Sequence, residues 1–550
     1  MSILKHSNMK KLVFLWLLTA VVLLPAQVST DEATWVGQSC TSIMVGKKAS
    51  VDGSVITSHT CDGRYRTWMY MEPAADHPVG AKHAVCTGTA HTAFRGDTTG
   101  VRVVGEIPEV MHTFAYLNTA YPCMNEKQLA MGETTFTGPD TLINPKGMFL
   151  IEELQRIALQ RCDNARSAIR LIGQLVKQYG YRDGGECITI ADKNEVWQME
   201  ILGEGPDRIG GVWAAQRIPD DEVGVSANIP RIGRLQRENP DYFMCSDNCE
   251  RVARRYRLWD GNGEFIFWKA FNSSYAQGKN FREREYFILN ALAPSLHLTM
   301  DMPELPFSVR PDVGVDVQQV MALFRATYEG TDMDMCQNLK VPVQRKDAQG
   351  VVTTDTTLSP SANPWMTGAT QRLYNSLAPG AVTFRRTVSV AWCSYSHVIQ
   401  LRDWLPDAVG GVCWLSVDNP GQSPRIPVFC GTTRLPHAFD LCGHKGYNPD
   451  AVLWQYRKAN KLATLGWQTL KQGMLQKVLQ HETQAIQRLK KLDKSVASLY
   501  EHATTEVELQ RAATSAAALL NDFTFQVYDE TSAEWGRLEK SYWERFGMGF

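Results

Sequence analysis

Basic tracts and zinc-binding cysteine motifs are missing from this sequence, and each absence removes a class of protein. The 57 Lys and Arg residues are balanced by 58 Asp and Glu residues, which gives a net charge of −1 without a basic cluster. Nucleic-acid-binding domains carry such clusters, so we expect no nucleic-acid partner. No Cys-x-x-Cys pair or Cys/His spacing of the zinc-binding kind occurs, so we expect no metal and no cofactor.

Long apolar runs are scarce as well. The run at residues 12–24 is too short to cross a bilayer comfortably, it follows three lysines, and polar sequence comes after it. This is the pattern of a secretory signal peptide. No other segment is apolar enough for a membrane span. We therefore expect a signal peptide over residues 1–26 and an exported protein, periplasmic or secreted, without a membrane anchor.

The 13 cysteines are an odd number, so an exported chain keeps at least one thiol unpaired. Cys245 and Cys249 are close enough in sequence to form a disulfide if the loop between them bends. The remaining pairings stay open. Apart from Cys40, which is treated below, the cysteines are interpreted as scattered core thiols with some disulfides.

Apolar patterns divide the chain into strands and helices. Runs at 42–45 and 54–59 flank Asp52-Gly53, which predicts a β-hairpin. Helical spacing predicts two helices near 150–158 and 168–176, with Asp163-Asn164 as an N-cap between them. Further strands are expected at 187–190, 196–201, 212–217, 223–228, 388–393 and 411–417. Hairpins alternating with helix pairs predict sheets covered by helices, an α+β layered domain.

The last hundred residues have a different pattern. Apolar residues recur at helical spacing between Trp467 and Leu499, which predicts a long amphipathic helix. Its polar face carries both signs of charge, which argues against membrane binding. We expect this helix to pack on the rest of the chain or on another subunit, so a homo-oligomer is left open.

Cys40 stands where the polar leader gives way to the first predicted strand. If the chain is cut between Ser39 and Cys40, this residue carries both a thiol and a free α-amine. An α-amine has a pKa of about 8, so an appreciable fraction is neutral at physiological pH. It can accept the thiol proton directly or through a water, which places nucleophile and base on one residue. The thiol can also attack the preceding carbonyl, so self-processing is chemically natural.

The predicted hairpin brings polar residues to this cysteine. In an antiparallel pair folded around residues 49–53, Cys40 lies across from about residue 60, so His59 and Asp62 are expected near it. A carboxylate there can hold the α-ammonium, and an imidazole can donate a hydrogen bond or move a proton. The alternative is that the end of the hairpin is polar simply because water covers it.

The segment CTSIMVGKKASVDGSVITSHTCDG closely resembles the start of mature bacterial dipeptidases of the PepD type. These are N-terminal-nucleophile (Ntn) cysteine hydrolases related to penicillin V acylase, bile-salt hydrolase and the secernins. YPCMNEKQLAMGETTF and WAAQRIPDDEVGVSANIPRIG extend the resemblance, which covers about residues 40–445. It implies hydrolysis of unblocked dipeptides through a thioester, and a four-layer αββα sandwich of two antiparallel sheets. The implied divisions are a propeptide at 27–39, a catalytic domain at 40–445 and a helical region at 446–550.

The resemblance also implies roles for single residues. Cys40 matches the nucleophile, and Asp62 matches the acid that holds its α-amine. Asn228 matches an asparagine that orients the nucleophile or lines the oxyanion hole. Arg386 is similar to an active-site arginine of the family, although Arg385 beside it is an alternative match.

Two positions depart from related sequences. His59 stands where many members have arginine, so a permanent cation is replaced by a titratable one. The acylase relatives have an oxyanion-hole asparagine near Glu133, and its absence here argues for a peptidase. We assign His59 and Glu133 to substrate binding, with Asp62 or Glu133 for a substrate ammonium and Arg386 for its carboxylate.

Three other functions stay open. The chain could be an Ntn amidase acting on N-acyl amino acids or β-lactams, or an inactive exported binding protein with the same fold. A papain-like protease would need a histidine partner for its cysteine, and His397 and His437 are the candidates. The papain signature around the cysteine is absent from the sequence.

Overall fold

The structure is a computed structural model that describes residues 40–272 and 279–547. The predicted signal peptide and propeptide, residues 1–39, lie outside the described residues. The described residues group into one compact unit. The boundary proposed between residues 445 and 446 stays a prediction.

Seven strands of the described chain form one antiparallel sheet in the order β16-β14-β1-β2-β19-β20-β21. The predicted hairpin is confirmed, because β1 and β2 are adjacent and Asp52 Oδ1 accepts a hydrogen bond from the Ser54 N–H in the turn (3.0 Å). The strands are β1 (Ser42–Val45), β2 (Val55–Asp62), β14 (Val223–Ser226), β16 (Ser308–Val309), β19 (Cys393–Leu401), β20 (Gly411–Val417) and β21 (Ile426–Phe429).

Eight strands of the described residues form a second antiparallel sheet, in the order β15-β13-β12-β11-β10-β9-β8-β3. The second predicted hairpin is β11–β12, and Asp192 closes its turn by accepting from the Asn194 N–H (2.8 Å). The strands are β3 (Tyr70–Glu72), β8 (Tyr116–Asn118), β9 (Met124–Asn125), β10 (Ala130–Thr135), β11 (Glu186–Ala191), β12 (Val196–Gly203), β13 (Gly211–Arg217) and β15 (Phe243–Cys245).

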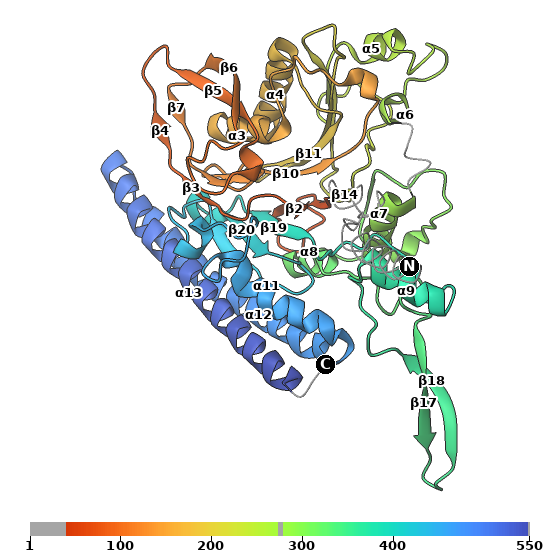
Figure 1. The fold of residues 1–550 in the computed structure, drawn as a ribbon. Helices are drawn as coiled ribbons and strands as arrows, with labels where there is room; N and C mark the ends of the chain where they lie inside the picture. The colour runs from red at the N-terminus through yellow and green to blue at the C-terminus, as the bar shows by residue number, and fades with distance from the viewer. Residues whose placement is uncertain (1–39, 273–278, 548–550) are drawn as a thin grey trace, which may run out of the picture. The chain divides into compact units, whose positions relative to one another are not determined.

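The two sheets are in contact, since β2 packs against β10, β11 and β12 (Figure 1). Helices α3 (Ile151–Arg161) and α4 (Ala165–Tyr179) contact the second sheet, and the predicted N-cap is confirmed because Asn164 accepts from the Ser167 N–H (2.9 Å). Helices α7 (Lys279–Leu292), α8 (Val317–Phe324) and α11 (Val452–Leu465) contact the first sheet. The α+β fold class is therefore confirmed.

The remaining strands and short helices lie outside these two sheets. Three separate two-stranded ribbons pair β4 with β7, β5 with β6 and β17 with β18 in the described chain. Their strands are β4 (Ala75–Asp76), β7 (His112–Thr113), β5 (Lys82–Thr87), β6 (Arg102–Pro108), β17 (Lys340–Lys346) and β18 (Val352–Leu358). The short helices are α5 (Cys249–Arg255), α6 (Phe267–Phe271), α9 (Gly368–Leu377) and α10 (Asp407–Gly410).

Two long helices close the chain. The predicted helix is α12 (Trp467–Tyr500), and α13 (Glu506–Phe546) follows it, begun by a capping box between Thr505 and Glu508. Helix α12 contacts α10 and α11, and α13 packs against α11, α12 and β21 (Figure 1). The predicted helix therefore packs on the rest of the chain, which was one of the two expectations. Within the described residues, no helix combines the length and apolarity that a membrane span requires.

Two expectations need correction. The strand predicted at 388–393 is wrong, because β19 begins only at Cys393. Val388 and Val390 are buried in a loop, where the Ser389 N–H donates to the Ala326 carbonyl instead of to a strand (3.0 Å). The alternating apolar residues here are buried, but this segment is not paired with a neighbouring strand. All 13 cysteines are free thiols, so the suggested Cys245–Cys249 disulfide is not formed in the described structure.

The packing of α13 can be tested at Trp535, which is fully buried and donates from Nε1 to Asn460 Oδ1 (2.9 Å). Trp535→Ala leaves a cavity and an unpaired amide oxygen. It should lower the free energy of unfolding by about 3–5 kcal/mol in urea denaturation followed by circular dichroism. Trp543→Ala on the same helix, where the side chain is 55% exposed, is the control and should change it by less than about 1 kcal/mol. Equal effects would contradict this packing.

Candidate active site

Cys40 lies two residues before the start of β1, at the open end of the β1–β2 hairpin, and its side chain is buried. The Thr41–Thr60 bridge continues the hairpin register, and the Thr60 N–H donates to the Thr41 carbonyl (2.9 Å). One further step along this register sets Cys40 opposite Cys61. The predicted position across from about residue 60 is confirmed.

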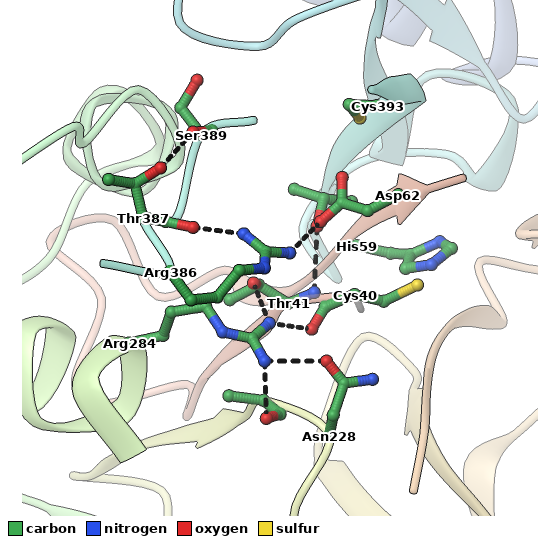
Figure 2. Close-up of polar contacts among 12 residues, drawn as sticks. Cys40, Thr41, His59, Asp62, Asn228, Arg284, Arg386, Thr387, Ser389 and Cys393 are labelled. Atoms are coloured by element: carbon green, nitrogen blue, oxygen red, sulfur yellow. Dashed lines mark hydrogen bonds and ion pairs between the residues drawn. The ribbon is translucent and has the colours of Figure 1, made fainter. Parts of the chain in front are cut away.

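Asp62 ends β2 next to this cysteine and is completely buried. Its Oδ2 accepts hydrogen bonds from the Thr60 hydroxyl (3.0 Å) and from Arg386 Nη2 (2.7 Å). Figure 2 shows the contact with Arg386. Its Oδ1 is buried and has no hydrogen-bond partner among the described residues. One oxygen of this carboxylate is therefore held by the protein, and the other can accept a further donor.

The two neighbouring arginines are separated by the structure. Arg386 is buried in the loop between α9 and β19 and forms an ion pair with Asp62. Arg385 forms its ion pair with Glu283 on α7. Arg386 is therefore the arginine at this site, and its contact is to the protein's own carboxylate.

Asn228 follows β14 in a left-handed conformation with φ of 62°. Strands β1 and β14 are antiparallel neighbours, and Ser42 lies opposite Ser226. Two further steps along this register set Cys40 opposite Asn228. Its Nδ2 donates to the Thr135 carbonyl (2.6 Å), and its Oδ1 accepts from Arg284 Nη2 (2.8 Å). Both ends of the amide are thus fixed.

Arg284 was not among the predicted site residues. It comes from α7, is fully buried, and donates from Nη1 to the Cys40 carbonyl and to the Thr41 hydroxyl (Figure 2). Burial, followed by the positive charge of Arg386, lowers its pKa to about 9. Its helix is more than 200 residues from Cys40 in sequence, and no local motif marks it.

Glu133 and His59 lie beside the sulfur. Glu133 comes from β10 in the second sheet, and its Oε1 lies 3.4 Å from Cys40 Sγ and 3.0 Å from His59 Nε2. All three side chains are buried. In Figure 2 the Cys40 sulfur points away from Arg284, towards the side on which the His59 ring lies. Glu133, assigned to substrate binding from the sequence, therefore contacts the sulfur itself.

Comparison with known proteins identifies the family of this chain. Residues 39–479 match the sequence model of Peptidase family C69. The chain belongs to peptidase family C69. This match confirms the resemblance drawn from the sequence and the prediction of a cysteine-type peptidase.

Several relatives share most of the length of this family member. A "Probable dipeptidase" of Latilactobacillus sakei is 23% identical over 496 residues, which cover 86% of this chain and 94% of that protein. A "Probable dipeptidase B" of Lactococcus lactis subsp. lactis is 25% identical, covering 76% and 79%. A "Probable dipeptidase" of Salmonella dublin is 24% identical, covering 72% and 81%.

Burial controls the protonation of the cysteine in this family member. Burial raises the pKa of the Cys40 thiol well above its ordinary value, and the negative charge of Glu133 raises it further. The backbone N–H of Asp62 offsets part of this rise. In the form described here, Cys40 is therefore a protonated thiol at neutral pH.

The charge beside the sulfur is concentrated on one carboxylate. Burial alone would raise the pKa of Glu133, but the hydrogen bond and charge of His59 outweigh it and lower the pKa. Burial, and then the charge of Glu133, raise the pKa of nearby Glu186 well above its ordinary value. Glu133 is thus the member of this carboxyl pair that keeps its charge.

The histidines considered for a papain-like pair lie elsewhere. His397 on β19 is paired with His59 on β2, with ring centroids 5.4 Å apart. Burial, then the charge of His59, lower the pKa of His397 well below its ordinary value, which keeps it neutral. His437 is exposed and contacts Asp440. Neither has a hydrogen bond to Cys40 in the described structure.

A recess of about 690 Å³ lies in another part of the molecule. Its walls come from α4, β13 and the region around Cys245, and they include Trp213 and Arg251. Its lining contains none of the predicted site residues. The polar cluster around Cys40 is therefore a better candidate for the active site than this recess.

The influence of Glu133 on the thiol gives a pH test. Because burial and Glu133 both raise the pKa of Cys40, its alkylation by iodoacetamide should reach half of its maximal rate above pH 9.0, the ordinary thiol value. Glu133→Gln removes the negative charge and should lower this midpoint. Mass spectrometry of the Cys40 peptide measures the profile. Glu126→Gln, on a partly exposed residue, is the control, and a higher midpoint in Glu133→Gln would contradict the assignment.

Proposed function

We propose that this chain is an exported cysteine dipeptidase that hydrolyses unblocked dipeptides through Cys40, exposed as the N-terminus when residues 27–39 are removed. The observation that carries the proposal is the polar shell around Cys40, placed at the start of the first strand. The names of the relatives support the substrate class. Export rests on the signal-peptide pattern at residues 1–26.

The proposal includes a four-layer αββα Ntn-hydrolase fold. Two antiparallel sheets in contact support it, together with helices that pack against each of them. Cys40 precedes β1, which lies inside the first sheet between β14 and β2.

The base in this proposal is the α-amine of Cys40. The sulfur has a side-chain hydrogen bond to Glu133 and none to an imidazole in the described residues. A free α-amine with a pKa of about 8 would take the thiol proton. Asp62, with Oδ1 lacking a described partner and Oδ2 held by Arg386, would hold the resulting ammonium.

The reaction then follows the chemistry of a thiol peptidase. The Cys40 thiolate attacks the peptide carbonyl, and the α-ammonium protonates the leaving amine. Water next attacks the thioester, with the amine as base. One N–H of the Asn228 amide donates to Thr135, and the other is left to stabilise the oxyanion. Such a donor contributes about 3 kcal/mol to transition-state stabilisation.

Two features refine the roles assigned from the sequence. Arg386 already donates to Asp62, so its role in the proposal is to position Asp62. Glu133 places a buried negative charge beside the sulfur, which favours a substrate with a free ammonium. An N-acyl substrate of an amidase would bring no positive charge to this carboxylate. Glu133 therefore favours the dipeptidase over the acylase alternative.

The nucleophile is tested by Cys40→Ala. This variant should lose all dipeptidase activity, because it lacks the thiol, and should keep its propeptide if cleavage is self-catalysed. N-terminal sequencing and mass spectrometry of the purified protein measure the second outcome. Wild-type protein should begin at Cys40.

Cys61→Ala is the matched control, because Cys61 is also buried and lies opposite Cys40. It should keep both activity and processing if it folds. An active Cys40→Ala enzyme would rule out the mechanism. A wild-type chain that keeps its propeptide and hydrolyses nothing would instead support the inactive binding protein.

The substrate class is tested with pairs of free and N-acetylated dipeptides. Loss of a charged hydrogen bond costs about 1.5–3 kcal/mol, so acetylation should lower kcat/KM about tenfold to hundredfold. Glu133→Gln should reduce this preference, whereas Glu126→Gln should keep it. A preference for the acetylated compounds would favour the amidase alternative.

A further inference from the structure

Three metal-ligating atoms of different kinds meet beside the nucleophile. Cys40 Sγ, a ring nitrogen of His59 and a carboxylate oxygen of Glu133 all lie within 4.8 Å of one another. In the described part of the chain, no other group of three such side chains satisfies this condition. A thiol, an imidazole and a carboxylate together form a donor set that suits Zn²⁺.

The spacing of these atoms agrees with tetrahedral coordination. Zinc binds sulfur at about 2.3 Å, imidazole nitrogen at about 2.0–2.1 Å and carboxylate oxygen at about 2.0–2.2 Å, which sets ligand atoms about 3.4–3.6 Å apart. Glu133 Oε1 lies 3.4 Å from Cys40 Sγ and 3.0 Å from His59 Nε2. Small movements of these side chains would bring all three onto one ion.

The three ligands are held by different strands. Cys40 precedes β1, His59 lies within β2 and Glu133 lies within β10 of the second sheet. Their separation in sequence explains why no metal motif was visible there. All three are buried, so a bound ion would lie away from the bulk solvent. The thiolate and the carboxylate together balance the two charges of the ion.

We propose that Cys40, His59 and Glu133 form a Zn²⁺ site that reversibly blocks the nucleophile. The fourth position is left to water or, in a chain that begins at Cys40, to its α-amine, which would close a five-membered chelate with the thiolate. A thiolate bound to Zn²⁺ cannot attack a carbonyl, so occupation inhibits the enzyme. This inhibitory role rests on the proposed function, whereas metal binding itself does not.

The site is suited to exchangeable binding. Ligating histidines normally donate from their second nitrogen to a carboxylate, a carbonyl or water, and loss of that contact weakens binding 10- to 100-fold. His59 Nδ1 is buried without a hydrogen-bond partner among the described residues. The three ligands would therefore hold the ion without this additional hydrogen bond. The weaker binding that results would let the ion leave again, which a reversible inhibitor must do.

Binding is measured with Co²⁺, which reports on sulfur coordination through its thiolate charge-transfer absorption. Wild-type protein, both full-length and processed, should show this band and saturate at one Co²⁺ per chain. Zn²⁺ should displace the Co²⁺ and inhibit dipeptide hydrolysis, and a chelator should restore activity. Cys40→Ser should lose the band, while His59→Gln and Glu133→Gln should each weaken binding at least about tenfold.

Cys442→Ser is the matched control. Cys442 Sγ lies 3.6 Å from His444 Nδ1, which makes a Cys–His pair outside the three-ligand cluster. This variant should keep the band and the affinity. Circular dichroism and thermal melting confirm that each variant is folded, and only folded variants are compared.

The outcomes separate this inference from the proposed function. A band that survives in Cys40→Ser, or an affinity unchanged in His59→Gln and Glu133→Gln, would overturn the metal site. A chain that binds one Co²⁺ through Cys40 but hydrolyses no dipeptide would keep the metal site and refute the dipeptidase. Activity that is insensitive to saturating Zn²⁺ would overturn the inhibitory role.

Discussion

The burial of ionisable groups around Cys40 is the constraint on which the rest of this site depends. Charges are costly away from water unless they are paired or hydrogen-bonded. Asp62 is paired with Arg386, and Glu133 is hydrogen-bonded to His59. Arg284 donates to backbone carbonyls and to Asn228. These partners fix each group in one geometry, which is what a preorganised active site requires.

The same environment bears on the activation of Cys40 that we propose. Burial and Glu133 keep the Cys40 thiol protonated in the form described here. The proposed N-terminal cut would add a base on the cysteine itself. His59 and Glu133 also form, together with Cys40, the cluster for which we propose Zn²⁺ binding. Reactivity and inhibition would then depend on the same three side chains.

Much of the fold was predictable because its signals are local. Asp52-Gly53 between two apolar runs predicted the β1–β2 hairpin, and Asn164 predicted the start of α4. The apolar spacing after Trp467 predicted α12. The strand expected at 388–393 was wrong, because buried valines in a loop give the same pattern as a half-buried strand. Pairing is a tertiary property that alternation alone cannot establish.

The sequence by itself determined the family, through the resemblance of its first strands, and it determined the hairpin. It also placed His59 and Asp62 near Cys40, because hairpin register follows from the position of the connecting turn. Only the tertiary structure decided that Glu133 contacts the sulfur, that Arg386 rather than Arg385 reaches Asp62, and that Arg284 holds the Cys40 carbonyl. These contacts join separate sheets and a distant helix. They depend on how the two layers pack, and sequence periodicity carries no information about which residues meet across that interface.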